Sequence, residues 1–376
     1  MKRALLAAVI FTLAPLALSH AQSDDAIALI KQVGLRESDV ASRDMEGWSR
    51  PSKISVLASG DVPTTGPGSA VWFSEATDGV EVEIVGGSGR SFDPHELVDT
   101  DVYVGRCSPS MIADGGKLRY IHIYSAGLDG CSSIPGLTDL NLIATNGAKT
   151  ASETIAEHAI ALLLTLSRNI HSYHQAQMSG KWARGELTGP PAISLQGRTM
   201  LVLGLGGIGS QVARRANDLG MRVIGTRNSS RSGPDFVEYV GLSDETVSLA
   251  AQADVVVNAL PLTDATRGIV NAEFLNNMPD GSYYVSVGRG RTTDTDALIK
   301  ALRGGKLAGA GLDVTDPEPL PANHELWSVP NVVITPHVAA RSALSGRNRW
   351  ILAKENIRRY VRGDKLLNLV DLERGY

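Results

Sequence analysis

The sequence predicts an α/β protein whose sheets are parallel, and three observations support this prediction. Short apolar runs alternate with helical patterns along most of the 376 residues. Several of the later runs are nearly continuous in Val, Ile and Leu, which is typical of parallel strands buried on both faces. The break Gly189-Pro190-Pro191 divides the runs into two series. The chain is long enough for two or three domains, so we expect one parallel sheet from each series.

The first series follows a polar, partly helical extension at residues 22–52. Its apolar runs are spaced for βα units, with helical stretches between some of them. A long helical pattern over residues 153–168 comes next, and its apolar residues share one face because they recur at three- and four-residue steps. The predicted strands are residues 54–58, 80–85, 101–104, 119–124 and 142–145.

The second series begins after the break and ends at Pro336. A helical pattern then covers residues 339–362 and could pack back on the first domain. The predicted strands of the second series are residues 199–203, 222–226, 254–260, 282–287, 308–313 and 331–335.

Residues 1–21 predict a signal peptide. A basic start at residues 2–3 precedes an apolar run over residues 4–18, and a small-x-small cleavage site follows at residues 19–21. The run is short for a membrane span and contains Pro15. We therefore expect export to the periplasm, with no stable membrane insertion after signal cleavage. The alternatives are an uncleaved anchor, or a misplaced start and a cytoplasmic protein.

Charge and cysteine content limit the ligands that we expect. The formal net charge of −4 offers no basic surface for nucleic acid. The two cysteines, Cys107 and Cys131, lack the spacing of a metal site, so we predict no metal. Both follow strands of the first series, and in an oxidising compartment they could pair. We hypothesise a disulfide between them, and two free, half-buried thiols are the alternative.

A glycine-rich turn opens the second series. Residues 204–209 have the pattern G-x-G-x-x-G between a predicted strand and a helical pattern over residues 210–219. The first glycine permits the tight turn, the second lets backbone approach a pyrophosphate, and the third lets the helix lie against the strand. The N–H groups of the helix N-terminus would face the phosphates. We predict dinucleotide binding, with a purely structural turn as the alternative. The predicted contacts are Gly204, Gly206, Gly207, Ile208 and Gly209.

The next strand ends where an acidic residue commonly holds the ribose of NAD, but Arg227 stands there. A guanidinium matches the geometry of a phosphate, which a carboxylate would repel. Asn228, Ser229 and Arg231 add donors and a second positive charge. We therefore predict NADP as the cofactor. The alternative is that both arginines face solvent and that NAD is preferred.

Three polar side chains follow strands of the second series: Arg289, Glu318 and His337. Because open parallel sheets bind ligands at the edge where their strands end, we expect these side chains to converge near the dinucleotide. Arg289 would clamp the carboxylate of a 2-keto acid and polarise its keto oxygen. Protonated His337 would give that oxygen a proton, and Glu318 would orient the imidazole and favour its protonated form. Each residue alone fits a turn or a solvated surface, but their joint occurrence favours catalysis.

Several motifs together closely resemble the D-isomer-specific 2-hydroxyacid dehydrogenase family, over about residues 53–371. Arg227, in place of the usual Asp, resembles the NADP-using glyoxylate/hydroxypyruvate reductase branch. The motifs are Ser125-Ala-Gly-Leu-Asp129, Ala156-Glu-His158, Gly204-Leu-Gly-Gly-Ile-Gly209, Pro261-Leu-Thr263, Thr266-Arg-Gly268, Val287-Gly-Arg-Gly290, Leu312-Asp-Val314, Pro317-Glu-Pro-Leu320 and Thr335-Pro-His337.

The resemblance implies two doubly wound parallel-sheet domains with the active site in a cleft between them. A flavodoxin-like substrate domain would comprise residues 53–147 and 337–376, and an inserted Rossmann cofactor domain would comprise residues 148–336. Members of this family are usually homodimers built around the cofactor domains, so we expect a homodimer by analogy. The family is typically cytoplasmic, which makes an export signal unusual.

The resemblance also assigns roles to individual residues. The three side chains described above take the catalytic positions of the family. Backbone at Ala126 and Gly127 would hold the substrate carboxylate, and Asp313 would hydrogen-bond the nicotinamide carboxamide. The further cofactor contacts that the resemblance implies are Pro261, Val287 and Gly288.

We therefore predict an NADP-dependent reductase of small 2-keto acids, with glyoxylate or hydroxypyruvate first. Arg106 could favour a polar or phosphorylated substrate tail. A phosphoglycerate-type dehydrogenase is an alternative within the family. Phosphite oxidation is disfavoured, because Ala126 stands where that enzyme carries a lysine. Formate oxidation is disfavoured, because Glu318 stands where that enzyme carries a glutamine. A nucleotide-sensing or binding protein without turnover is the alternative from a different class, and only a turnover assay distinguishes it.

Overall fold

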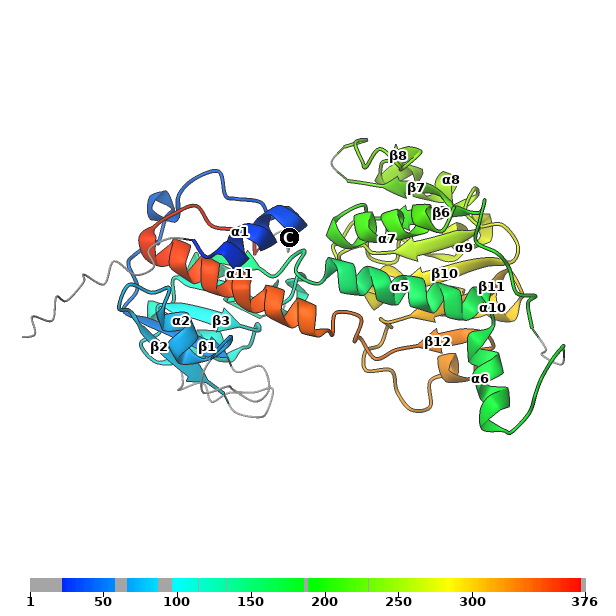
Figure 1. The fold of residues 1–376 in the computed structure, drawn as a ribbon, viewed down its shortest axis with the longest axis horizontal. Helices are drawn as coiled ribbons and strands as arrows, with labels where there is room; N and C mark the ends of the chain where they lie inside the picture. Colours follow the sequence, from blue (N-terminus) through cyan, green and yellow to red (C-terminus); the bar gives the residue numbers. More distant parts are fainter. Residues whose placement is uncertain are drawn as a thin grey trace, which may run out of the picture.

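The computed structural model describes residues 22–57, 66–86, 97–113, 115–132, 134–185, 189–228 and 230–372. Within them the chain forms two parallel sheets that lie apart, each with its own helices (Figure 1). The first sheet has five strands in the order β2-β1-β3-β4-β5, and the second has seven in the order β12-β11-β10-β9-β6-β7-β8. Both orders reverse direction at an inner strand, as doubly wound sheets do. The predicted fold class is therefore confirmed.

The first sheet is built from the strands that the sequence predicted, with small shifts at their ends. The inner strands β3 and β4 and the edge strand β5 are buried along their whole length. The edge strand β2 instead exposes Glu81 and Glu83, and such charges discourage pairing with another chain. The strands are β1 Lys53–Leu57, β2 Glu81–Val85, β3 Val102–Gly105, β4 Tyr120–Ile123 and β5 Ile143–Asn146. The helices of this part are α1 Asp24–Val33, α2 Ala70–Ser74, α3 Ser110–Ala113, α4 Asp129–Ser132 and α11 Ala343–Arg362.

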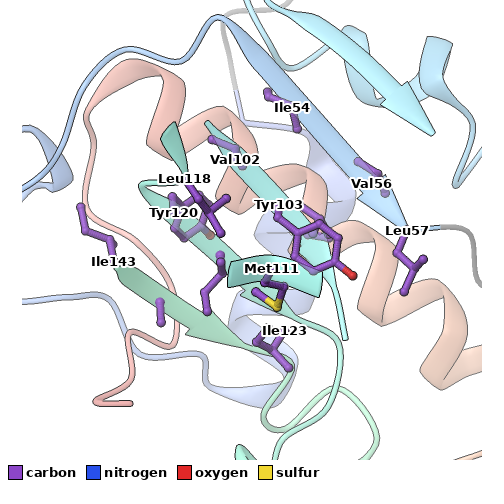
Figure 2. Packing of buried hydrophobic residues seen from close by; sticks show 14 of the residues in the cluster. Ile54, Val56, Leu57, Val102, Tyr103, Met111, Leu118, Tyr120, Ile123 and Ile143 are labelled. Atoms are coloured by element: carbon purple, nitrogen blue, oxygen red, sulfur yellow. The ribbon is translucent and has the colours of Figure 1, made fainter. Parts of the chain in front are cut away.

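The core of the first domain joins this sheet to the last helix. Tyr120 of β4 stacks on Tyr360 of α11, with ring centroids 4.4 Å apart. Figure 2 shows β1 and β3 packing their aliphatic side chains beside Met111 and Leu118. Each fully buried aliphatic side chain of this kind contributes about 1.5–3 kcal/mol to folding. This burial explains why α11 returns to a sheet formed much earlier in the chain.

The N-terminal extension is part of the same packing unit. Helix α1 begins after Ser23, whose side chain accepts a hydrogen bond from the backbone N–H of Ala26 at 3.2 Å, and it ends at Gly34 with φ of 62°. Its apolar face lies against α11. The shared cluster contains Ala26, Leu29, Leu35, Ile351, Leu352 and Leu367.

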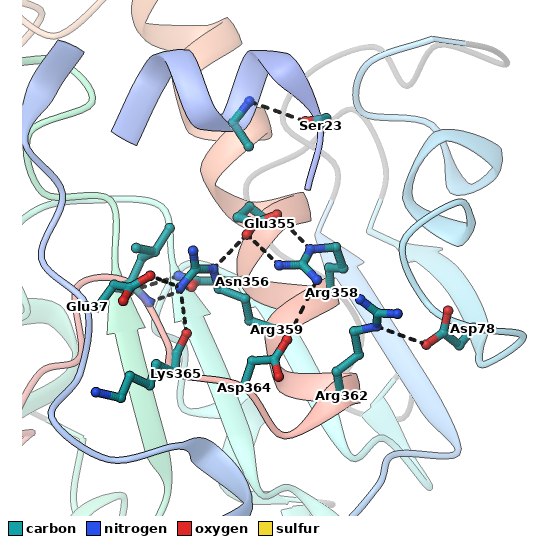
Figure 3. A network of polar contacts seen from close by, with 12 residues as sticks. Ser23, Glu37, Asp78, Glu355, Asn356, Arg358, Arg359, Arg362, Asp364 and Lys365 are labelled. Atoms are coloured by element: carbon teal, nitrogen blue, oxygen red, sulfur yellow. Dashed lines mark hydrogen bonds and ion pairs between the residues drawn. The ribbon is translucent and has the colours of Figure 1, made fainter. Parts of the chain in front are cut away.

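A network of charged side chains ties α11 to the extension and to the end of the chain (Figure 3). Glu355 is only 4% exposed and accepts from Nε of Arg359 at 2.6 Å and from Arg358 at 2.9 Å. Arg359 also donates to Glu37 at 2.7 Å and to the carbonyl of Lys365 at 2.8 Å. Buried charges are tolerated because each one is paired in this way.

The second sheet also forms from the predicted strands, together with one that the sequence analysis missed. That strand, β8, has only three residues at the sheet edge, which is too short for a periodicity to be visible. The strands are β6 Thr199–Leu203, β7 Arg222–Thr226, β8 Tyr239–Gly241, β9 Val255–Asn258, β10 Ser282–Ser286, β11 Leu307–Leu312 and β12 Val332–Ile334. The helices are α5 Ser152–Ser167, α6 Ile170–Met178, α7 Gly207–Asp218, α8 Thr246–Ala250, α9 Ala272–Asn277 and α10 Thr295–Arg303.

The chain crosses between the two sheets twice, once before α5 and once before α11 (Figure 1). The two crossings contact each other. The hydroxyls of Thr154 and Ser342 lie 2.9 Å apart, and the side chain of Asn348 donates to the carbonyl of Thr150 at 3.3 Å. A third contact joins the ammonium of Lys149 to the carbonyl of Gly34. Hydrogen bonds among the described residues therefore hold the two crossings together.

Cys107 and Cys131 form the hypothesised disulfide, with Cα atoms 5.0 Å apart. The bridge joins the segment that follows β3 to helix α4, which follows β4. The predicted signal peptide lies outside the described residues. Among the helices of the described part, none is both long and apolar enough to cross a membrane.

Candidate active site

The glycine-rich turn connects β6 to α7, and α7 begins at Gly207, earlier than the predicted start at residue 210. Gly204 adopts φ of 88°, which only glycine adopts readily. A Cβ on Gly209 would lie 2.0 Å from the carbonyl oxygen of Gly204, so strand and helix could not approach as they do. A Cβ on Gly206 would instead meet nothing within 4 Å. The turn therefore leaves open space at the helix N-terminus, where a pyrophosphate fits.

Gly207 and Ile208 connect this turn to the rest of the domain. A Cβ on Gly207 would lie 2.7 Å from Oγ of Ser152 and 3.0 Å from Cγ of Lys149, so the first crossing runs directly over the turn. Ile208 is partly buried and packs against the apolar core of the second domain. The position of the phosphate site is thus set partly by the segment that links the domains.

Arg227 lies against the glycine-rich turn. Its Nε donates to the carbonyl of Leu205 at 3.0 Å, and within the described residues its terminal nitrogens have no acidic partner. Burial lowers the pKa of the Lys149 ammonium, and the charge of Arg227 adds to this effect, so the two cations lie near each other. An unneutralised positive charge beside an open phosphate cradle favours a cofactor with an additional phosphate.

Arg231 differs from Arg227, although the same role was predicted for both. Its Nη1 lies 2.7 Å from the carboxylate of Glu245 and 2.8 Å from the hydroxyl of Tyr239. This guanidinium is already neutralised by a protein carboxylate. Asn228 is exposed beside the turn, and Ser229 lies outside the described residues. Cofactor contacts by these residues remain predictions.

Two further loops at strand ends lie next to each other. A Cβ on Gly288 would be 2.5 Å from the carbonyl oxygen of Leu260, so the loops after β9 and β10 touch through backbone. Val287 donates its N–H to the carbonyl of Asn258 at 3.0 Å and is buried. Pro261 is exposed. The three predicted cofactor contacts Pro261, Val287 and Gly288 therefore share one edge of the second sheet.

Asp313 has a structural role that the sequence did not predict. Its carboxylate is 2% exposed and accepts from the Thr335 hydroxyl at 2.6 Å and from the N–H groups of Val338 and Ala339 at 3.0 Å each. Nε2 of His158 lies 2.8 Å from Oγ1 of the same Thr335 and 3.5 Å from the Asp313 carboxylate. A buried carboxylate needs such donors, and here they anchor the second crossing beside His337. The predicted nicotinamide contact of Asp313 remains a prediction.

His337 and Glu318 form a close pair. Nδ1 of His337 lies 2.5 Å from Oε1 of Glu318, and the two side chains are 44% and 40% exposed. His337 adopts φ of 53°, an uncommon conformation for a residue with a side chain, and its N–H donates to the carbonyl of Asp313 at 2.8 Å. With Nδ1 directed at a carboxylate, Nε2 remains for proton exchange with a ligand.

Arg289 lies on the loop after β10, between the glycine-rich turn and this pair in strand order. Its Nη1 donates to the carbonyl of Gly288 at 2.8 Å. A Cβ on Gly290 would be 1.8 Å from the carbonyl oxygen of Thr315, so this loop packs tightly on the segment that leads to Glu318. The structure thus carries a half-buried cation and an imidazole–carboxylate pair on the ends of neighbouring strands. This set can bind an anionic group and move a proton.

The edge of the first sheet offers backbone groups. Ser125, Ala126 and Gly127 follow β4, and the first two are exposed. The amide of Asn146 donates to the carbonyl of Ala126 at 2.7 Å, and the Ser125 hydroxyl donates to the carbonyl of Gly127 at 2.8 Å. These contacts fix the loop that was predicted to hold a carboxylate. No group of three or more metal-binding side chains occurs in the described part of the chain.

Comparison with known proteins agrees with this geometry. Residues 160–339 match the model of the D-isomer specific 2-hydroxyacid dehydrogenase NAD binding domain. A glyoxylate reductase of Pyrococcus furiosus is 33% identical over 275 residues, which cover 71% of this chain and 80% of that protein. A D-isomer specific 2-hydroxyacid dehydrogenase of Xanthobacter autotrophicus, solved with NADPH and MES, is 30% identical with a TM-score of 0.69, covering 86% and 100% of the two chains. An NADPH-dependent glyoxylate/hydroxypyruvate reductase of Sinorhizobium meliloti, solved with NADP and malonate, is 27% identical with a TM-score of 0.68, covering 87% and 98%.

Proposed function

The chain belongs to the D-isomer specific 2-hydroxyacid dehydrogenase family, and we propose that it reduces small 2-keto acids of the glyoxylate or hydroxypyruvate type to D-2-hydroxy acids with NADPH. The observation that carries the proposal is the His337–Glu318 pair, 2.5 Å apart, on the strand edge that also bears the glycine-rich turn. The named activities of the relatives from P. furiosus and S. meliloti support the same substrate class.

The reaction needs a hydride at the keto carbon and a proton at the keto oxygen. A bound nicotinamide supplies the hydride. Arg289 binds the substrate carboxylate and polarises the keto group, and the backbone N–H groups of Ala126 and Gly127 hold the same carboxylate from the other domain. Protonated His337 donates its Nε2 proton to the oxygen that becomes the hydroxyl. Glu318 holds Nδ1 and so orients the imidazole, which later regains its proton from solvent.

The preference for NADPH rests on Arg227. Its guanidinium lies on the glycine-rich turn with no acidic partner among the described residues, and Lys149 adds a second positive charge nearby. A 2′-phosphate would neutralise both, whereas the 2′-hydroxyl of NAD would not. The NADPH-bound relatives support this choice.

The test is a set of initial rates of the purified protein with glyoxylate and hydroxypyruvate, each with NADPH and with NADH. We expect oxidation of NADPH at ordinary enzyme rates, well above the rate with NADH. The variants Arg289→Ala and His337→Ala are the controls, and both should bind cofactor with kcat lowered by about 100-fold or more. Binding of cofactor with no turnover in the unsubstituted protein would contradict the proposal and favour a sensor. Activity with NADH alone would contradict only the cofactor preference.

We also propose a homodimer. Helix α6 stands out from the second domain (Figure 1), and with the segment after it exposes large apolar side chains. Trp182 is 91% exposed and Met178 74% exposed, and such patches mark interaction surfaces. Sedimentation analysis should give a dimer, and Trp182→Ser should shift it toward monomer, whereas Trp327→Ser at a separate exposed site should not. A monomer in the unsubstituted protein would contradict the proposal.

Export to the periplasm is a separate proposal. It rests on the basic, apolar and small-x-small pattern of residues 1–21, and it is supported by the Cys107–Cys131 disulfide, which persists in oxidising compartments. In a host with a periplasm, the mature protein should begin at Gln22 and appear in the periplasmic fraction. A cytoplasmic protein that retains residues 1–21 would overturn this proposal and leave the proposed reaction intact.

A further inference from the structure

A carboxylate of the protein holds the second arginine of the segment between β7 and β8. Arg231 lies in the same segment as Arg227, and its Nη1 is 2.7 Å from Oε2 of Glu245. The same nitrogen donates to the hydroxyl of Tyr239 at 2.8 Å, and that hydroxyl donates to Oε1 of Glu245 at 2.5 Å. The guanidinium carbon also lies 5.9 Å from the centroid of the Tyr239 ring. The three side chains therefore form a closed triangle that fixes where Arg231 points.

The carboxylate of Glu245 is held in place by groups other than Arg231. Its Oε2 accepts from the backbone N–H of Leu242 at 2.8 Å, at the start of the short turn η5 Ser243–Glu245. Hydrogen bonds from the Tyr239 hydroxyl and from the Leu242 N–H lower the pKa of Glu245, so the carboxylate is charged near neutral pH. Because these two bonds do not involve Arg231, the negative charge stays where it is when Arg231 moves.

Direct contacts connect this triangle to Arg227. Thr226 and Gly241 are the paired last residues of β7 and β8, and the N–H of Arg227 donates to the carbonyl of Gly241 at 2.9 Å. A Cβ on Gly241 would lie 3.4 Å from Oε2 of Glu245 and 3.4 Å from Cε1 of Tyr239. The charge of Glu245 therefore lies beside the residue that holds the backbone of Arg227.

This position places Glu245 against any additional phosphate on the cofactor. A phosphate monoester carries roughly 1.5–2 negative charges near pH 7. A 2′-phosphate bound at Arg227 would be repelled by Glu245 and would compete with it for the guanidinium of Arg231. The 2′-hydroxyl of NAD carries no charge and meets neither effect. The carboxylate should therefore weaken the binding of NADPH and leave that of NADH unchanged.

We propose that Glu245 is a positioning residue that determines cofactor specificity. It holds Arg231 away from the 2′-phosphate, and so narrows the preference for NADPH over NADH that Arg227 creates. This inference deepens the proposed function, because it rests on the binding of NADPH beside Arg227. It also gives the difference between the two arginines a functional consequence, since only one of them is available to the cofactor.

The test is a fluorescence titration of NADPH and NADH with the variant Glu245→Gln. The amide can still accept from Leu242 and Tyr239, so the substitution removes the charge and keeps the turn. We expect NADPH to bind about 5-fold to 10-fold more tightly, as for a partly exposed charged hydrogen bond, and NADH to bind unchanged. The control is Glu238→Gln, whose carboxylate pairs with Arg222 at 2.8 Å at the start of β7. No gain for NADPH, an equal gain for NADH, or an equal gain in the control would overturn the inference.

A double variant tests whether Arg231 is the group that Glu245 restrains. Adding Arg231→Gln to Glu245→Gln should remove most of the gain in NADPH affinity, because the freed guanidinium is then absent. The coupling between the two substitutions is read from the four dissociation constants of the cycle. A gain that persists in full without Arg231 would overturn the positioning role, because Glu245 would then act on the phosphate by repulsion alone.

A binding measurement separates this inference from the proposed reaction. Calorimetry compares 2′-phospho-ADP-ribose with ADP-ribose, neither of which carries a nicotinamide. If no 2-keto acid is reduced but Glu245→Gln still binds the 2′-phosphorylated probe more tightly, the proposed reaction fails and this inference stands. If 2-keto acids are reduced with NADPH but Glu245→Gln binds both probes as the unsubstituted protein does, the reaction stands and this inference fails.

Discussion

The carboxyl edges of the two parallel sheets carry different chemistry. The edge of the second sheet carries a glycine-rich turn and the His337–Glu318 pair, which can move a proton. The edge of the first sheet carries exposed backbone at Ala126, the guanidinium of Arg349 over the Tyr124 ring, and a disulfide. This difference agrees with the proposed function, in which residues of the second domain would transfer the proton and residues of the first would hold the substrate.

The two edges also differ in how they are held. Asp313 fixes the segment next to His337 through hydrogen bonds from Thr335, Val338 and Ala339. The edge of the first sheet is fixed instead by a disulfide that joins the segment after β3 to helix α4. Changes on one edge should therefore alter catalytic rate, and changes on the other should alter substrate affinity and the stability of the first domain. The following four predictions test this division.

The largest effect is expected at the reacting edge. His337→Ala should lower kcat by about 10²–10⁴-fold, the range for loss of a general acid, and leave the dissociation constant of NADPH unchanged. Glu318→Gln should cause a smaller loss, because the imidazole keeps a hydrogen-bond partner at Nδ1 but loses the carboxylate. Steady-state rates and fluorescence titration of NADPH measure both. A loss in kcat below about 10-fold for His337→Ala would contradict its assigned role.

Removal of the disulfide should affect the first domain alone. The bridge spans a sequence separation of 24 residues, for which loop closure predicts a loss of about 3 kcal/mol in the free energy of unfolding when both cysteines become serine. Urea unfolding followed by tryptophan fluorescence reports this, because Trp48, Trp72 and Trp350 pack against the core of that domain. KM for substrate should rise, and NADPH affinity should not change. Two free thiols in the denatured, unreduced protein would refute the bridge itself.

The next prediction concerns the pH dependence of stability, through a histidine in the core of the first domain. His122 is fully buried in β4, and burial lowers its pKa to about 3. In the unfolded chain its pKa is about 6.5, so only the unfolded state takes up the proton as the pH falls below that value. Stability is therefore intact above pH 6.5 and decreases toward pH 3, by about 2 kcal/mol at pH 5 from this residue alone.

His122→Gln should remove that part of the acid sensitivity. For each protein the free energy of unfolding is measured at pH 7 and at pH 5, and the difference between the two values is compared. The substitution also removes the hydrogen bond to Thr145, but this loss is the same at both pH values and cancels in the difference. The matched control is His174→Gln, at an exposed position on α6. Parallel pH profiles for the unsubstituted protein and His122→Gln would show that the histidine does not limit stability in acid.

The smallest effect is expected for cofactor preference. Arg227→Asp should lower the NADPH/NADH ratio of kcat/KM by 10-fold or more, which corresponds to about 1.4 kcal/mol. The control is Arg231→Gln, because this arginine is already paired with Glu245 at 2.7 Å and should change the ratio less. An unchanged ratio in Arg227→Asp would refute the role of this residue. An equal effect of both variants would refute the difference that the structure indicates between them.

Local patterns in the sequence determined much of the fold. Buried parallel strands are recognisable because burial on both faces requires continuous apolar runs, and β6 and β7 have the bounds that these runs predicted. The start of α7 was placed too late, because Gly207, Ile208 and Gly209 were assigned to the turn, and glycine has low helix propensity. The short strand β8 was missed because its position depends on pairing with β7 rather than on its own residues.

The sequence by itself determined the fold class, the glycine-rich turn and the contact between Glu318 and His337, because each depends on residues adjacent in the chain or on strand ends that share one edge. Only the tertiary structure decided that Arg231 pairs with Glu245 while Arg227 has no acidic partner among the described residues, and that Arg349 lies against the Tyr124 ring. Arg349 and Tyr124 are far apart in the sequence, and the buried face of α11 also carries Asn348, Glu355, Asn356 and Arg359. Hydrophobic periodicity could not indicate which charged side chains face inward, because ion pairing depends on neighbours that only folding brings together.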